Sequence, residues 1–143
     1  MDEVGGDADG LSQLRALIAS GRKPGILIAL DFDFIEVEAG RAVFAGTPGE
    51  HAYNPIGAVH GGVCRNTARL GAVHSRLTAS QAFTTLELKV AYHKRVTKDT
   101  GILRAEGNLL SFGQRVAFAE ARLTDAQGKL YASATSTLLV FDR

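Results

Sequence analysis

The sequence predicts an α+β protein in which an antiparallel sheet of about six strands is covered by one long helix. Apolar residues recur at helical spacing in two stretches before residue 78, and the chain after them alternates apolar and polar residues. Turn sequences such as KDTG, SFGQ and DAQGK divide this second half into separate strands. A sheet with a helix on one face buries both apolar surfaces, so it is the simplest arrangement of these elements.

Length and composition indicate one globular domain. The 143 residues are 45% hydrophobic and 22% charged, with a formal net charge of +1, which argues against a disordered chain and against nonspecific nucleic-acid binding. Residues 1–10 hold four acids and three glycines, so we expect a mobile tail followed by a single domain over 11–143. The absence of a secretory signal, of a long apolar run and of paired cysteines predicts a cytoplasmic protein with no membrane partner.

The first elements are a helix and a hairpin. Leu11, Leu14, Leu17 and Ile18 have helical spacing, and Gly21 is suited to end that helix. The run ILIALDFDFIEVEAG, residues 26–40, has the alternation of a strand, and 41–47 is its returning arm across the turn at 39–40.

A loop and a second helix follow. Residues 48–62, PGEHAYNPIGAVHGG, are rich in turn formers and predict a loop. Residues 63–77 contain no proline and favour a helix, because five mostly apolar residues lie on one helical face: Val63, Thr67, Leu70, Val73 and Leu77.

Four more strands complete the chain, over 85–92, 102–110, 116–123 and 130–141. In the first of these, Leu86, Leu88, Val90 and Tyr92 alternate with polar residues and should face the core. Two later strands present unusually small faces, which suit the close approach of another element: Ala117, Ala119, Ala121, Ala132 and Ala134.

The string NPIGAVHGG, residues 54–62, leads directly into the second helix and carries a resemblance. Together with TTLELKVAYHKRV and SFGQRVAFAEARLTDAQGKLYASATSTLLV, it resembles the hotdog-fold acyl-CoA thioesterases of the phenylacetate-pathway (PaaI) type, over roughly residues 27–141. The resemblance implies a sheet wrapped around the central helix and a homodimer with one continuous sheet, often paired again into a homotetramer. It also implies a coenzyme A thioester as substrate, and no other cofactor is expected. No metal is expected either, because a single cysteine excludes a multi-cysteine zinc site and His51, His74 and His93 are not at metal-ligand spacing with any carboxylate.

The resemblance assigns catalytic roles to four residues. The Gly61 N–H would polarise the thioester carbonyl, Asn54 and His60 would hold the loop or the attacking water, and Thr85 would help to orient that water. The role of Gly61 is physically reasonable, because N–H groups at a helix start are unpaired and glycine allows a carbonyl to approach closely. The alternative is that Gly61 only ends a loop and that Thr85 is an ordinary strand threonine.

Other polar and aromatic residues allow two interpretations each. Four cationic side chains could bind the phosphates of coenzyme A, or they could simply be exposed to solvent at the ends of strands: Lys94, Arg95, Lys98 and Arg115. Four aromatic residues could line a pocket for an aromatic acyl group or belong to the core: Phe83, Tyr92, Phe112 and Phe118. The remaining histidines, His51, His74 and His93, are expected to be structural or exposed. Cys64 is expected to be a small buried side chain and not a nucleophile.

The sequence departs from the family pattern at the catalytic position. The pattern places Asp or Glu on the helix about six residues after His-Gly-Gly, and this position is occupied by Arg69. No Asp or Glu lies anywhere between Glu50 and Glu87. The chain therefore lacks the carboxylate that would activate water, and it places Arg65 and Arg69 in an enclosed helix, where a buried cation is costly.

Two explanations fit this departure. One is genuine divergence. The other is a local frameshift over residues 63 to about 71, because back-translated codons read one base later can give YAATLLDSA, which includes an aspartate.

The sequence thus predicts an acyl-CoA thioesterase that releases a free acid and coenzyme A, with activity lowered by the missing carboxylate. The alternative is a non-catalytic protein that binds acyl-CoA. A dehydratase acting on acyl thioesters is a weaker third reading, since it needs a histidine with a carboxylate partner.

Overall fold

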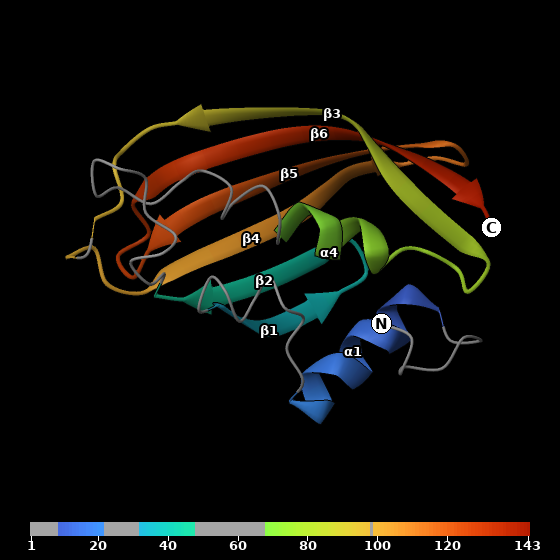
Figure 1. Cartoon of the computed structure of the whole chain (residues 1–143), viewed down its shortest axis with the longest axis horizontal. Coiled ribbons are helices and arrows are strands. Elements are labelled where there is room, and N and C mark those ends of the chain that lie inside the picture. The colour runs from blue at the N-terminus through green and yellow to red at the C-terminus, as the bar shows by residue number, and fades with distance from the viewer. Residues whose placement is uncertain (1–8, 22–31, 48–67, 98) are drawn as a thin grey trace.

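The computed structural model describes residues 9–21, 32–47, 68–97 and 99–143 (Figure 1). Residues 1–8 of the tail predicted over 1–10, and the loop predicted over 48–62, lie outside these residues. The elements are α1 (Gly10–Ser20), β1 (Phe32–Glu38), β2 (Arg41–Gly46), α4 (Ala68–His74), β3 (Gln81–Tyr92), β4 (Leu103–Phe112), β5 (Val116–Asp125) and β6 (Leu130–Asp142).

The strands form one antiparallel sheet of six in the order β1-β2-β4-β5-β6-β3, and α4 packs on its centre against β2, β4 and β5. Figure 1 shows α4 lying across one face of the curved sheet, with α1 beside β1. The predicted sheet of about six strands with a central helix is therefore confirmed. Within the described residues, neither helix is long and apolar enough to cross a membrane.

Close approach between α4 and the sheet depends on residues that have little or no side chain. A Cβ added to Gly107 on β4 would collide with the backbone of Ala68, and one added to Gly71 on α4 would lie 2.7 Å from the Cβ of Ala42. The small faces predicted on β5 and β6 are buried on the same side. Backbone-to-backbone packing therefore sets the position of α4.

The core lies between α4 and the sheet and is filled by two groups of buried side chains. One group includes Phe32, Phe44 and Leu103 beside the start of α4, and the other includes Val73, Leu77 and Leu138 beside its end. The apolar face predicted for the second helix is thus confirmed for the part that the structure describes.

Helix α1 is capped at both ends and docks on the end of α4. The Asp9 carboxylate accepts from the Ser12 N–H at 2.8 Å, and Gly21 ends the helix with a φ of 72°. The Gly10 N–H donates to the Leu77 carbonyl at 2.8 Å. The predicted helix from 11 to 21 is confirmed, and two residues expected in the tail, Asp9 and Gly10, instead form its cap and first turn.

His74 and Gln13 add a side-chain contact between the two helices. The His74 Nε2 and the Gln13 Oε1 are 2.9 Å apart. Burial lowers the pKa of His74, with a smaller contribution from the positive charge of Arg143. His74 therefore lies in a structural helix contact, whereas the exposed His93 contacts the Ser133 hydroxyl.

The alternation expected along β3 is wrong in part. A bulge between Thr85 and Glu87 inserts Leu86 as an extra residue, so Thr85 lies opposite Leu138 while Leu88 lies opposite Ser136. Leu86 is 58% exposed instead of facing the core. Tyr92 lies opposite Ala132, on the same face as Leu88, but is 67% exposed because it is the last residue of the strand. A strand read by simple alternation cannot account for a bulge, because the extra residue moves its neighbours to the other face.

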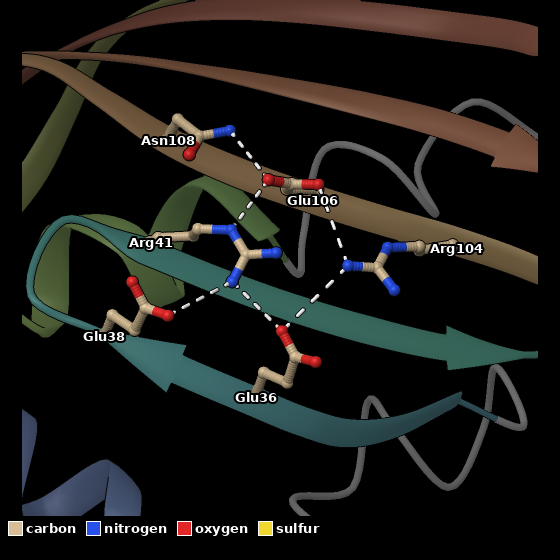
Figure 2. Close-up of polar contacts among 6 residues, drawn as sticks. All are labelled: Glu36, Glu38, Arg41, Arg104, Glu106 and Asn108. Carbon is tan, nitrogen blue, oxygen red and sulfur yellow. Dashed lines mark hydrogen bonds and ion pairs between the residues drawn. The ribbon is translucent and has the colours of Figure 1, made fainter. Parts of the chain in front are cut away.

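The face of the sheet away from α4 carries a network of charged side chains that joins β1, β2 and β4 (Figure 2). The Arg41 guanidinium donates to Glu106 at 2.8 Å and to Glu36 at 3.0 Å. Val43, which lies between Glu36 and Glu106 in the strand register, is fully buried. The network members are Glu36, Glu38, Arg41, Arg104, Glu106 and Asn108.

Charge pairing in this network shifts the pKa values of its central pair. The hydrogen bond from Arg41 lowers the pKa of the Glu106 carboxyl, and the same bond raises the pKa of Arg41. The ionised form of Glu106 is therefore favoured in the folded protein.

Gly107→Ala should destabilise the protein by about 1–3 kcal/mol, because the added methyl group forces α4 away from β4. Urea denaturation monitored by circular dichroism measures the free energy of unfolding. An unchanged value would contradict the close contact between Gly107 and the Ala68 backbone.

Glu106→Gln should lower stability at pH 7 by about 1 kcal/mol or less. Because folding lowers the pKa of Glu106, the wild-type advantage is present above the unfolded pKa and is lost as the pH falls through the folded one. The two proteins should therefore converge between roughly pH 5 and pH 3. Glu120→Gln, on the same face of β5, is the control; a constant gap between Glu106→Gln and wild type at all pH values would contradict the assignment.

Candidate active site

Several of the predicted catalytic residues lie outside the described residues. Asn54, His60 and Gly61 belong to this group. Lys98, a predicted phosphate-binding cation, and Cys64 also lie outside the described residues. The proposed oxyanion contact and the assignment of Cys64 therefore stay predictions. The candidate site can be built from the helix position that the family pattern reserves for an acid and from the strands beside it.

The structure brings Arg69 and Thr85 together. Arg69 is the second residue of α4 and is only 5% exposed. Its Nη1 donates to the Thr85 Oγ1 at 3.0 Å and to the Ser136 Oγ at 3.4 Å. The helix position expected to carry the acid and the strand position expected to orient water thus face each other.

The bulge in β3 explains how Thr85 reaches this position. It places Thr85 on the face that looks toward α4 while leaving the residue exposed at the sheet edge. The Ser136 hydroxyl donates to the Glu87 carbonyl at 2.8 Å, which fixes the bulge to β6. Bulges are frequent next to active sites because they redirect a side chain without breaking the sheet.

Ser136 is a site residue that the sequence reasoning missed. It is 4% exposed and lies on the inner face of β6, where its neighbours at alternate positions are apolar. Ala132, Ala134, Leu138 and Val140 occupy those positions, so Ser136 is a single polar residue in an apolar row. That interruption was the signal in the sequence.

The chemistry available to this cluster differs from that of a carboxylate. An arginine side chain stays protonated in proteins and only donates hydrogen bonds, so Arg69 cannot remove a proton from water. It can stabilise negative charge and can orient the oxygen atoms of Thr85 and Ser136. The Thr85 hydroxyl accepts from Arg69 and has its own proton to donate to a ligand.

Among the described residues, two of the cations predicted to bind phosphate, Lys94 and Arg115, lie far apart within one chain. The Lys94 N–H donates to the Tyr131 carbonyl at 3.1 Å, whereas the Arg115 carbonyl accepts from the Val140 N–H at 2.7 Å. Tyr131 and Val140 are at opposite ends of β6, roughly 30 Å apart at the usual rise of a strand. Lys94 and the neighbouring Arg95 therefore lie at one end of the sheet and Arg115 at the other.

Lys129 joins Lys94 at its end of the sheet. The proximity of Lys129 lowers the pKa of Lys94, and the Lys94 Nζ lies 5.5 Å from the centre of the Tyr131 ring. The Tyr131 hydroxyl in turn donates to the Asp125 carboxylate at 3.0 Å. The sequence does not single out Lys129, because this residue lies in the DAQGK turn, whose composition predicts only a connection between strands.

The four aromatic candidates also occupy different places. Phe83 and Phe112 pack against the core beside α4, which agrees with the core interpretation. Phe118 is 45% exposed between the buried Ala117 and Ala119, so it points to the opposite face of the sheet. With Tyr92 also exposed, the four rings do not line one pocket.

Comparison with known proteins identifies the fold. No protein-family model and no curated protein matches the sequence. Solved structures do match: a thioesterase family protein from Silicibacter pomeroyi has a TM-score of 0.76 and 18% identity, covering 91% of this chain and 96% of its own. A putative thioesterase from Ralstonia eutropha, described as a phenylacetic acid degradation-related protein, has a TM-score of 0.75 and 23% identity, covering 88% and 98%.

A third solved structure shows a ligand. The protein smu.793 from Streptococcus mutans, bound to acetyl-CoA, has a TM-score of 0.67 and 21% identity, covering 78% of this chain and 90% of its own. The predicted hotdog architecture is thus confirmed by the six-stranded sheet around α4 and by these neighbours. The chain has the hotdog fold that is shared by thioesterase-family proteins.

Proposed function

We propose that this protein hydrolyses acyl-CoA thioesters to a free acid and coenzyme A, at a rate well below that of a thioesterase with a carboxylate at position 69. The observation that carries the proposal is the contact of Arg69 with Thr85 inside a thioesterase fold. The acetyl-CoA bound to the Streptococcus mutans protein supports coenzyme A esters as ligands of this fold. In a hypothetical thioesterase protein from Streptococcus pneumoniae with a similar structure, an aspartate and a threonine were each replaced by alanine.

In the proposed reaction, water adds to the thioester carbonyl carbon and the thiolate of coenzyme A leaves. The Gly61 N–H stabilises the negative oxygen, and Asn54, His60 and Thr85 position the carbonyl and the water. The attacking water must lose a proton, which the leaving thiolate gains. No carboxylate at position 69 accepts that proton on the way, and a general base is typically worth about 10²–10⁴-fold in rate.

Coenzyme A recognition in this proposal uses cations from the Lys94 end of the sheet. Lys94, Arg95 and Lys129 supply positive charge there, and ammonium and guanidinium groups complement phosphate oxygens.

Arg69→Asp should raise thioesterase activity by about tenfold or more, because it supplies the missing base at the helix position that faces Thr85. The rate is measured as release of free thiol from a panel of acyl-CoAs. Mass spectrometry of the purified wild-type protein first verifies that position 69 is arginine. Arg69→Asn is the matched control, since it has the shape of aspartate without its charge. A full thioesterase rate in the wild type, or an equal rise in both variants, would contradict this account of the missing acid.

The second candidate function is acyl-CoA binding without turnover. It is favoured by the same side chain, because a guanidinium cannot accept a proton from water. Saturable binding of acyl-CoA with no thiol release from any ester would select it over the first proposal.

We further propose that the protein forms a homodimer through the free edge of β3. What supports a dimer is the position of β3, twelve residues long, at one end of the described sheet, with the exposed Leu86 on it. Long open edges with exposed apolar residues favour pairing with another strand. Antiparallel pairing of two β3 strands would bring the Lys94 end of one chain beside the Arg115 end of the other.

Leu86→Arg should therefore convert the dimer into a monomer, because it places a charge at the paired edge. Leu110→Arg is the matched control, since both leucines are 58% exposed and both are extra residues at strand bulges. Light scattering after size exclusion should give about twice the 15.2 kDa of the chain for wild type and for the control. A monomeric wild type, or an Leu86→Arg protein that stays dimeric, would contradict pairing at β3.

A further inference from the structure

Two lysine side chains that are far apart in the chain meet at one end of the sheet. Lys94 follows β3, and Lys129 lies in the turn between β5 and β6. The Lys94 N–H donates to the Tyr131 carbonyl at 3.1 Å, and the Lys129 N–H donates to the Asp125 Oδ1 at 2.9 Å. The backbone at both lysines is therefore fixed, and their side chains lie within hydrogen-bonding range of each other.

The acid beside these lysines, Asp125, is used within the turn. Its Oδ1 accepts from the Gln127 and Lys129 N–H groups, both at 2.9 Å, and its Oδ2 accepts from the Tyr131 hydroxyl at 3.0 Å. In the part of the chain that the structure describes, no carboxylate forms an ion pair with the ammonium group of Lys94 or Lys129. The proximity of Lys129 lowers the pKa of Lys94 and outweighs the opposing effect of Asp125. Two like charges held together in this way are stabilised by an anion that contacts both.

We infer that Lys94 and Lys129 form a binding site for a phosphate monoester, and that the group bound in the proposed reaction is the 3′-phosphate of coenzyme A. The inference rests on the proposed function and adds which phosphate these lysines recognise. A phosphate monoester carries about two negative charges at pH 7, whereas each phosphate of the diphosphate bridge has only one ionisable oxygen. Two ammonium groups match a dianion in charge, and their N–H groups match its several acceptor oxygens.

The distance from this site to Thr85 fits coenzyme A. Lys94 contacts Tyr131 on β6, and Thr85 lies opposite Leu138 on the same strand. These two β6 residues are separated by about 23 Å at the usual rise of a strand. The pantetheine arm and diphosphate place about twenty covalent bonds between the thiol and the 3′-phosphate, which span a similar length at the dimensions of an extended peptide, about 3.5 Å for every three bonds. The thioester carbonyl can therefore lie beside Thr85 while the phosphate lies between the two lysines.

Coenzyme A and dephospho-coenzyme A test the inference, because they differ only in the phosphate monoester. Titration calorimetry with the full chain at low salt should show coenzyme A binding about tenfold or more tightly, the size expected of charge-assisted hydrogen bonds. Low salt is used because exposed charges are screened at high ionic strength. Acetyl-CoA is the third ligand and reports whether a thioester binds.

Variants test the assignment to the two lysines. The double variant Lys94→Gln, Lys129→Gln should bring the ratio of the two dissociation constants to about one, and each single variant should lower the ratio in part. Lys129→Arg should retain the preference, because a guanidinium also complements phosphate oxygens. Lys89→Gln, which removes an exposed lysine from the face of β3 that points away from α4, is the matched control and should leave the ratio unchanged.

Each other outcome overturns a defined part of the inference. Equal binding of coenzyme A and dephospho-coenzyme A by wild type would overturn recognition of the phosphate monoester and leave the proposed function standing. A preference that survives in the double variant would place the phosphate away from Lys94 and Lys129 and would overturn their assignment. Failure of all three ligands to bind would overturn the proposed function as well.

Discussion

The seating of α4 on the sheet is the constraint on which the rest of the structure depends. Gly107 and Gly71 allow helix and strand backbones to approach so closely that a methyl group at either position would collide. The alanines of β5 and β6 extend this thin layer across the sheet. Because α4 lies so close to the sheet, the side chain of Arg69, its second residue, reaches Thr85 on β3 and Ser136 on β6.

Charge is distributed unevenly between the two faces of the sheet. The outer face carries carboxylates and guanidiniums in mutual contact over β1, β2 and β4, where the fully buried Val43 lies between Glu36 and Glu106 in the strand register. On the inner face, the described residues of α4 include Arg69 and no acid. A near-neutral total charge therefore conceals a paired outer surface and a buried arginine, which is why the composition alone indicates nothing about the site.

The sequence predicted the fold well and the site only in part. Periodicity and turn residues located the α1 helix, the β1–β2 hairpin and the later strands, because these features are local. The Leu86 bulge was not predicted, since it depends on how β3 pairs with β6. The position of Arg69 was identified from the family pattern, but its hydroxyl partner Ser136 lies 67 residues away and only the fold brings the two together.

The prediction of phosphate-binding cations depends on where each cation lies along the sheet. The clustering of Lys94 and Arg115 as phosphate ligands was an inference from residue type alone. Their contacts at opposite ends of β6 separate them in one chain. Charge type can be read from a sequence, whereas the end of the sheet that a cation occupies is set by strand order.

The bulge at Leu86 also affects how this chain must be compared with others. On its two sides the inward-facing residues are Thr85 and Leu88, three positions apart, where an unbroken strand would have them two apart. A relative without the extra residue would carry the same inner face under a numbering shifted by one. Matching residues by strand alternation would then pair Thr85 with a residue on the wrong side of the sheet, so distant relatives are best aligned separately before and after this point.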